Sequence, residues 1–286
     1  MLQVFYDSID PVAFTIGPLE VRWYGLAYLA GFILCTFVVY RIGKRWKIGI
    51  NVDDMMVILI AIMLGTIIGA RLGYVLFYGN GYYFTHPVEI FMLSNGGMSF
   101  HGGLIGMVVG GVIASKITRI KFLTMADLVV ISVPIGLFFG RCANFINGEL
   151  WGAVTDAPWG VVFEIGGPLP RHPTQLYEAF LEGIVLFIVL YLLSRKKPPL
   201  HRGTYLGIFL VLYGVFRILI EFVRQPDAQI GYLAGDWLTM GMVLSIPVVI
   251  GGIVMLVFAF KTKLPQEGDP RVLEAESSQS AASSDE

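Results

Sequence analysis

The chain has 286 residues, of which 56% are hydrophobic and only 14% charged, and its mean hydropathy is +0.72. A soluble domain carries about 25% charged residues, so this composition excludes an ordinary soluble protein and predicts an integral membrane protein. The net charge of −1, without a basic cluster interleaved with aromatic residues, argues against nucleic-acid binding. The two cysteines, Cys35 and Cys142, supply neither a disulfide framework nor a metal-binding spacing.

Seven stretches are long and apolar enough to cross a bilayer, whose core of about 30 Å needs about 20 residues of helix. They cover residues 21–40, 55–78, 101–116, 125–142, 174–194, 204–223 and 238–260. The expected fold class is therefore an all-α integral membrane protein with seven transmembrane helices. We expect residues 1–263 to form the transmembrane domain, with arms and a small head over about 143–173. The polar residues 264–286 predict a disordered tail.

Basic residues predict the orientation of these spans. Of the 20 Lys and Arg residues, 14 follow the first, third, fifth or seventh span. Because cytoplasmic loops are rich in Lys and Arg, the N-terminus is expected on the outer side of the membrane, and the C-terminus and the 264–286 tail in the cytoplasm. The six other basic residues are all arginines: Arg22, Arg71, Arg141, Arg171, Arg217 and Arg224. A planar guanidinium suits bidentate contact with phosphate, so this bias favours a phosphate-handling site over scatter.

The first three predicted spans carry few polar candidates. Tyr24 lies in the first span, where tyrosines commonly form part of the interfacial belt. In the second and third spans, glycines recur at a spacing that lets helices approach closely (Gly65, Gly69, Gly73, Gly106 and Gly110). His101 lies in the motif G-G-M-S-F-H-G-G-L-I-G, from Gly96 to Gly106, with glycine on its flank. An accessible imidazole can act as a base near neutral pH; the alternative is a packing histidine.

The end of the fourth span holds the densest motif, G-R-C-A-N-F-I-N-G-E-L-W-G, from Gly140 to Gly152. Arg141 and Asn144 share a face if the helix continues, and Asn147, Glu149 and Gly152 would form the turn that follows. Side chains of these types can bind phosphodiester oxygens and glycerol hydroxyls.

The fifth and sixth spans contain ionisable groups, which cost at least ~2.5–3.5 kcal/mol at the centre of a bilayer and indicate function. Glu178 and Glu182 share a face of the fifth span, and we expect a structural role for them, compensated by Arg171 and His172. The sixth span places four residues on one face: Tyr213, Arg217, Glu221 and Arg224. Two arginines to one acid predict surplus positive charge that binds an anion; the alternative is an Arg–Glu pair that fixes helix packing.

The long motif closely resembles the signature of the bacterial phosphatidylglycerol–prolipoprotein diacylglyceryl transferase family. The resemblance extends to five further motifs: W-Y-G (Trp23–Gly25), G-G-M-S-F-H-G-G (Gly96–Gly103), R-H-P-T-Q-L-Y-E (Arg171–Glu178), Y-G-V-F-R (Tyr213–Arg217) and E-F-V-R-Q-P-D (Glu221–Asp227). It implies a multi-pass enzyme of the bacterial inner membrane, with its active site toward the periplasm. The implied reaction transfers the sn-1,2-diacylglyceryl group of phosphatidylglycerol to the lipobox cysteine of a preprolipoprotein. A thioether forms and glycerol 1-phosphate leaves, with no metal or cofactor expected.

The resemblance also implies roles for residues. Four are implied to be catalytic: His101 as the base, Arg141 as the main phosphate contact, Arg217 near the reacting centre, and Tyr24. Phosphatidylglycerol binding is implied for Arg141, Asn144, Glu149, Gly152, Gly96, Gly102 and Tyr213. Glu221 and Arg224 are implied to support this arrangement.

Two other classes of protein are alternatives. A transporter or channel for an organic anion would share the intramembrane arginines but favours inverted repeats, and we find no internal repeat. A structural scaffold would not need charges and amides concentrated at the same ends of several spans.

Overall fold

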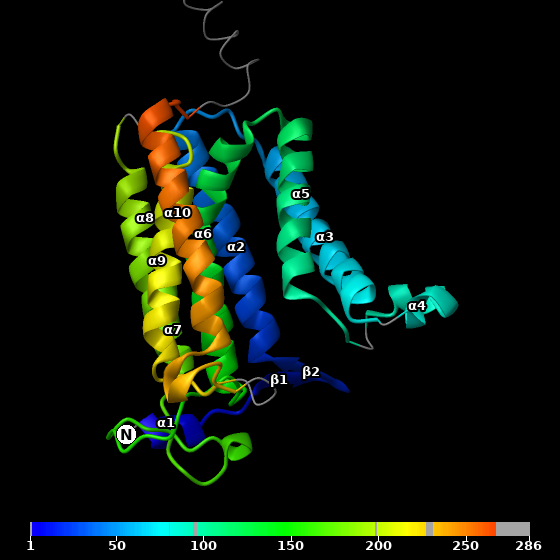
Figure 1. Cartoon of the computed structure of the whole chain (residues 1–286), viewed down its shortest axis with the longest axis vertical. Helices are drawn as coiled ribbons and strands as arrows, with labels where there is room; N and C mark the ends of the chain where they lie inside the picture. Colours follow the sequence, from blue (N-terminus) through cyan, green and yellow to red (C-terminus); the bar gives the residue numbers. More distant parts are fainter. Residues whose placement is uncertain (1, 80, 94–95, 198, 227–230, 267–286) are drawn as a thin grey trace, which may run out of the picture. The chain divides into compact units, whose positions relative to one another are not determined.

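A computed structural model describes residues 2–79, 81–93, 96–197, 199–226 and 231–266. Within them, seven helices are long and apolar enough to cross a membrane, which confirms the predicted spans (Figure 1). The spans are α2 (Trp23–Arg45), α3 (Val52–Phe77), α5 (Phe100–Thr118), α6 (Phe122–Ile146), the continuous Thr174–Ser194, α9 (Thr204–Glu221) and α10 (Met240–Thr262). The chain is therefore a multi-pass α-helical membrane protein.

The chain divides into two compact units, which we describe separately. Among the described residues, the first unit lies within residues 2–39 and 127–265, and the second lies within residues 40–126 and includes Gln266. The helices α2 and α6 each contribute to both units.

In the second unit, α3 and α5 pack along a seam of glycines and lie side by side in Figure 1. A Cβ atom on Gly106 would lie 2.8 Å from the carbonyl carbon of Gly65 and 2.9 Å from the Cα of Gly69. Only hydrogen fits there, because backbone meets backbone. The predicted close approach of the two spans is confirmed. Asn51 and Asp54 form a capping box that starts α3.

A short arm connects these two helices. It contains the α4 helix (Tyr82–Thr85) and the 3-10 helix η1 (Pro87–Phe91). Several of its apolar side chains are exposed, among them Phe84, Val88 and Phe91.

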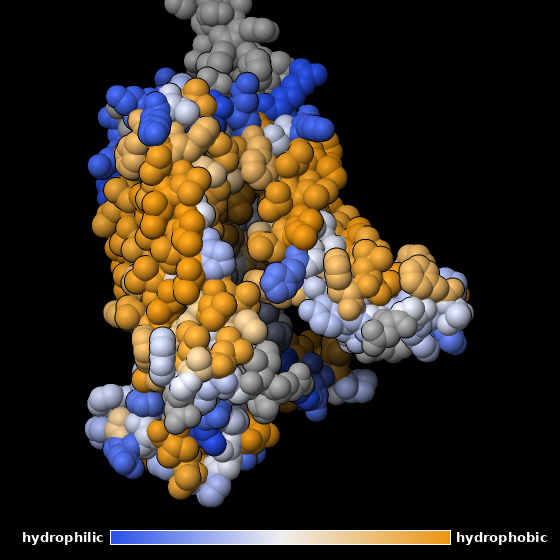
Figure 2. All heavy atoms as spheres, viewed as in Figure 1, coloured by the Kyte–Doolittle hydropathy of each residue, from blue (hydrophilic) through white to orange (hydrophobic). Residues whose placement is uncertain are grey.

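In the first unit, α9 and α10 pack along each other, again through glycines. Beside α9 runs the span Thr174–Ser194, built from α7 (Thr174–Glu178), the π-helical η4 (Ala179–Val185) and α8 (Leu186–Ser194). Gly183 of η4 lies against α6, where a Cβ would be 2.7 Å from Phe138 Cβ. The visible sides of α8 and α10 are covered by apolar residues, as lipid-facing helices require (Figure 2).

The head of the first unit consists of the α1 helix (Leu2–Asp7), the β1–β2 hairpin (Val12–Ile16 and Leu19–Arg22) and the loop after α6. Its small core is formed by Phe145, Val161 and Phe163, with Tyr6 packed edge-on against both phenylalanines. The loop contains the 3-10 turn η3 (Glu164–Gly166).

The opposite end of the first unit is held by buried polar contacts. The Asp127 carboxylate accepts hydrogen bonds from the backbone N–H groups of Gly203 (2.7 Å) and Leu206 (2.8 Å), at the start of α9. Arg202 donates to the carbonyl oxygen of Pro265, and its backbone N–H donates to Leu264. Leu264 and Pro265 are thus hydrogen-bonded, whereas residues 267–286 of the predicted disordered tail lie outside the described residues.

Candidate active site

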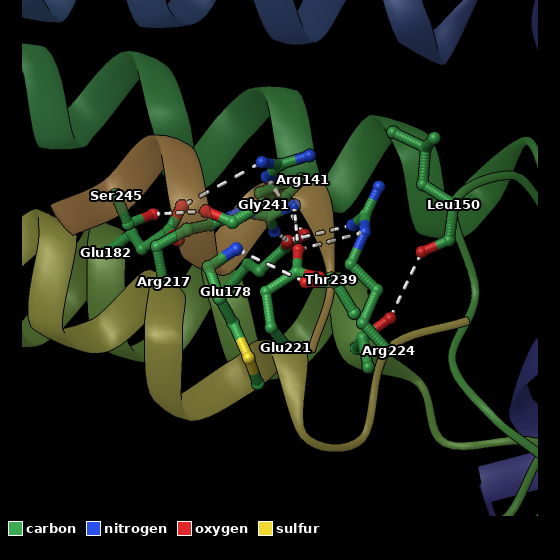
Figure 3. Close-up of polar contacts among 12 residues, drawn as sticks. Arg141, Leu150, Glu178, Glu182, Arg217, Glu221, Arg224, Thr239, Gly241 and Ser245 are labelled. Carbon is green, nitrogen blue, oxygen red and sulfur yellow. Dashed lines mark hydrogen bonds and ion pairs between the residues drawn. The ribbon is translucent and has the colours of Figure 1, made fainter. Parts of the chain in front are cut away.

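Three arginines and three glutamates form one cluster in the first unit (Figure 3). Glu178 of α7 is its centre. Oε1 of Glu178 accepts hydrogen bonds from Nη1 of Arg217 and, at 3.0 Å, from Nη1 of Arg224. Oε2 of the same carboxylate forms an ion pair with Nε of Arg141 at 3.0 Å. One acid therefore joins the arginine of α6 to the two arginines of α9 and its C-terminal end.

The other two acids complete the cluster from different sides. Glu221 Oε1 contacts Nη2 of Arg217 and lies 3.6 Å from Nε of Arg224. Glu182 lies 3.8 Å from Nη2 of Arg141, and neither of its carboxylate oxygens accepts a hydrogen bond within the described part of the chain. Glu182 therefore acts on Arg141 mainly through charge.

This arrangement corrects two sequence-based predictions. The predicted surplus positive charge was wrong, because Glu178 and Glu182 join Glu221 and balance the three arginines formally. The predicted compensation of Glu178 and Glu182 by Arg171 and His172 was also wrong. Their face of the span turns toward α6 and α9, whose arginines lie closer than the loop that precedes the span.

The acids and the arginines of the cluster nevertheless differ in how far they are buried. The side chains of Glu178 and Glu182 are fully buried and that of Glu221 is 3% exposed, whereas Arg141, Arg217 and Arg224 are 18%, 16% and 11% exposed. Among the described residues, Nη1 of Arg141 and Nη2 of Arg224 have no partner. The accessible side therefore presents guanidinium donors to an incoming anion, and the acids stand behind them.

The signature motif of the fourth span forms a turn held by Glu149. Its carboxylate accepts from the side-chain amide of Asn144 at 2.8 Å and, at 3.5 Å, from Asn147. Its backbone carbonyl accepts from Nε2 of the buried Gln175 at 2.6 Å. The structure thus brings Asn144 and Glu149 together, and their part in lipid binding stays a prediction. The role of Gln175 was missed, since nothing in its sequence position indicates a partner 26 residues away.

Gly152 connects this turn to the arginine cluster. Gly152 and Arg224 form an isolated antiparallel bridge, and a Cβ on Gly152 would lie 2.5 Å from the carbonyl oxygen of Val223. Any side chain at this position would push the loop away from the backbone that carries Arg224. Gly152 is thus required for packing next to the cluster.

Arg171 and His172 stabilise the head. The Arg171 guanidinium stacks 4.1 Å from the Trp151 ring centre and donates to the carbonyl of Gly166 at 2.9 Å and to Gln225 at 3.2 Å. Burial lowers the pKa of His172, so its neutral form is favoured. Nδ1 of this imidazole lies 3.1 Å from the hydroxyl of Tyr177.

Two tyrosines from the predicted site also lie in the first unit. The hydroxyl of Tyr24, at the start of α2, is 3.1 Å from that of Tyr28. Tyr213 lies one helical turn before Arg217 on α9, and its ring stacks on Phe209 at 5.7 Å between centres.

His101, Gly96 and Gly102 belong to the second unit. His101 is the second residue of α5 and is exposed, with its ring 5.7 Å from that of Phe100. Gly102 packs against α3, where a Cβ would lie 2.9 Å from Gly73 Cα. Gly96 has a φ of +74°, which favours glycine. Close helix packing therefore explains the glycine at 102, and the positive φ explains the glycine at 96.

Arg71, also in the second unit, is a buried structural anchor. Its guanidinium donates to five backbone carbonyls, those of Glu89, Ile90, Met92, Gly96 and Gly97, at 2.5–3.3 Å. Arg22 pairs with Glu20 on the surface at 3.0 Å. The interpretation that all six arginines handle phosphate was therefore too broad. Among the described residues, Arg141, Arg217 and Arg224 are the three of them that share one ion-pair cluster.

Among the described residues, no group of three His, Cys, Asp or Glu side chains is arranged so that it could hold a metal ion. The fold and the cluster define a multi-pass membrane protein with a preformed group of arginines that can bind an anion.

Comparison with known proteins identifies the family. The sequence model of the prolipoprotein diacylglyceryl transferases matches residues 11–258. The chain is 51% identical over 259 residues to the phosphatidylglycerol–prolipoprotein diacylglyceryl transferase of Aliivibrio salmonicida, covering 91% of this chain and 90% of the relative. The relative of the same name in Geobacter sulfurreducens is 47% identical over 259 residues, covering 91% of this chain and 98% of the relative. The chain belongs to the prolipoprotein diacylglyceryl transferase family.

Proposed function

We propose that this protein transfers the sn-1,2-diacylglyceryl group from phosphatidylglycerol to the lipobox cysteine of a preprolipoprotein, the first step of bacterial lipoprotein maturation. The relatives that carry this activity in their names match nearly the whole chain. The enzyme resides in the bacterial inner membrane with its site toward the periplasm, and residues 1–263 form its catalytic domain. One observation carries the proposal at the level of chemistry: the accessible side of the cluster presents guanidinium donors, including Nη1 of Arg141, which has no partner among the described residues.

In the proposed reaction, the cysteine sulfur attacks the glyceryl carbon that bears the phosphate. The C–S bond forms as the C–O bond breaks, and glycerol 1-phosphate leaves with the electron pair of that bond. The thiol has an ordinary pKa of about 8.5, so a base that removes its proton assists the attack. We assign this base to His101, which is exposed at the start of α5.

Charge develops on the departing phosphate, and guanidinium groups stabilise it without reorganising. Arg141 is the main phosphate contact in this proposal, and Arg217 lies near the reacting centre with Tyr213 beside it. Asn144 and Glu149 shape the lipid site, and Gly152 holds the loop against Arg224. Gly96 and Gly102 are also proposed to bind phosphatidylglycerol. Tyr24 completes the catalytic set, and Glu221 and Arg224 support it.

The Arg141→Ala variant tests the proposal directly. We expect it to lower the release of glycerol phosphate from phosphatidylglycerol and a lipobox peptide by about 100-fold or more, because one charged donor to the developing anion is lost. The assay uses purified protein in detergent, and Arg22→Ala, which removes an exposed surface arginine, is the matched control.

Two results would contradict the proposal. The wild-type protein could fail to form the thioether, as an anion transporter would. Alternatively, Arg141→Ala could turn over at the wild-type rate, which would exclude Arg141 as the phosphate contact.

A further inference from the structure

The N-terminal end of α10 touches the arginine cluster through one side chain, that of Thr239. Thr239 caps this helix, and its Oγ1 accepts a hydrogen bond from the backbone N–H of Met242 at 3.2 Å. The same Oγ1 lies 2.6 Å from Oε2 of Glu221. Both Thr239 and Glu221 are buried, at 2% and 4% exposed.

The direction of these hydrogen bonds is fixed by chemistry. A backbone N–H can only donate, so the Thr239 oxygen accepts from Met242. Its single O–H then donates to Glu221, whose ionised carboxylate can only accept. The only hydrogen of this hydroxyl is therefore used by Glu221, and the contact holds Oε2 on the side of α10.

This contact determines what the other oxygen of Glu221 can do. With Oε2 held by Thr239, Oε1 faces Arg217 and lies 3.6 Å from Nε of Arg224. Both arginines also contact Glu178, so each guanidinium spans two fixed carboxylates. A rotation of the Glu221 carboxylate would remove one of the two supports from both arginines.

Gly241 leaves the space in which that carboxylate sits. A Cβ on Gly241 would lie 2.5 Å from Cδ of Glu221 and 3.0 Å from Oε2. The carboxylate thus occupies the volume of a missing side chain in the first turn of α10, where the helix dipole also favours negative charge.

We infer that Thr239 is a positioning residue for the proposed transfer reaction and that it orients Arg217 and Arg224 through Glu221, with Gly241 providing the room. This inference rests on the proposed function. Neither Thr239 nor Gly241 is proposed to contact the lipid. Thr239 and Gly241 therefore affect the rate of the chemical step, because the arginines must be oriented to stabilise the charge that develops on the departing phosphate.

The first test compares Thr239→Val, which keeps the shape but lacks the hydroxyl, with Thr239→Ser, which keeps the hydroxyl. We expect Thr239→Val to lower kcat for transfer to a lipobox peptide at least 10-fold while KM for phosphatidylglycerol changes less than threefold, and Thr239→Ser to stay within twofold of wild type. Asn51→Ala is the control for cap loss alone, since Asn51 caps α3 without touching the cluster. Equal activity of the Val and Ser variants would overturn the inference, and so would an equal loss in Asn51→Ala.

A double variant shows whether Thr239 acts through Glu221. If it does, Thr239→Val combined with Glu221→Gln is no slower than Glu221→Gln alone, whereas independent effects would multiply and contradict the inference.

The Gly241→Ala variant keeps the test decisive if Thr239→Val does not fold, because alanine favours the helix. We expect it to lower kcat at least 10-fold by displacing the Glu221 carboxylate. Gly251→Ala on the same helix, where a Cβ meets nothing within 4 Å, should leave kcat unchanged. Wild-type behaviour of Gly241→Ala would overturn the inference. A wild-type protein that forms no thioether would instead refute the proposed function, so the two failures are distinguishable.

Discussion

Arg71 and Arg141 both lie toward the ends of membrane-spanning helices, yet their donors have different uses. All the donor groups of Arg71 face backbone carbonyls between residues 89 and 97, and the residue is 4% exposed. Arg141 is held at Nε and leaves Nη1 without a partner among the described residues. An arginine whose donors are saturated stabilises the fold, and one with a donor to spare can bind a ligand.

The Arg71→Gln variant should therefore be unstable. Five carbonyls would lose their shared donor, and we expect the free energy of unfolding to fall by about 2–4 kcal/mol. The measurement is the unfolding midpoint of the purified protein in detergent. Arg22→Ala, which breaks an exposed ion pair, should change it by less than about 1 kcal/mol. A wild-type midpoint for Arg71→Gln would show that the arm does not depend on this anchor.

At the scale of elements, glycines determine how closely helices approach. The seam between α3 and α5 brings backbone against backbone at Gly65, Gly69 and Gly106. The same device brings η4 against α6 at Gly183, and α6 carries Arg141 one turn further on. Helix packing thus sets the distance across which Arg141 reaches Glu178.

A methyl group at Gly106 should separate α3 from α5. We expect Gly106→Ala to lower the free energy of unfolding by about 1–3 kcal/mol, as overpacking does. Gly136→Ala is the matched control, because its Cβ would meet nothing within 4 Å and alanine favours the helix. Equal unfolding midpoints for the two variants would mean that the seam tolerates a side chain.

Sequence patterns predicted where the helices lie better than they predicted which residues of different helices contact each other. Length and apolarity located all seven spans, because crossing a bilayer restricts the backbone to helices. The periodicity of Glu178 and Glu182 also showed that they share a face. It could not show that this face meets Arg141 and Arg217, since contacts between spans depend on packing across the bundle. Arg71 is a similar case, because backbone carbonyls leave no signature in a sequence.

For the whole molecule, the distribution of Lys and Arg predicts a testable orientation. In a chain whose two cysteines are replaced by alanine, Ser8→Cys should react with a membrane-impermeant maleimide in intact spheroplasts. Lys197→Cys should react only after the membrane is permeabilised, because its loop is rich in basic residues and is expected to be cytoplasmic. Both positions are exposed. Labelling of Lys197→Cys in intact spheroplasts would contradict the orientation.

The balance of three acids and three arginines has a consequence for repeated turnover. A phosphodiester lipid carries one negative charge, and the phosphomonoester that departs carries about 1.5–2 at neutral pH. A site made of cations without acids would bind the product, glycerol 1-phosphate, more tightly than the substrate, phosphatidylglycerol. Product release would then be too slow for repeated turnover. With Glu178, Glu182 and Glu221 standing behind the guanidinium groups, the proposed site can grip the headgroup through directed hydrogen bonds and still release it.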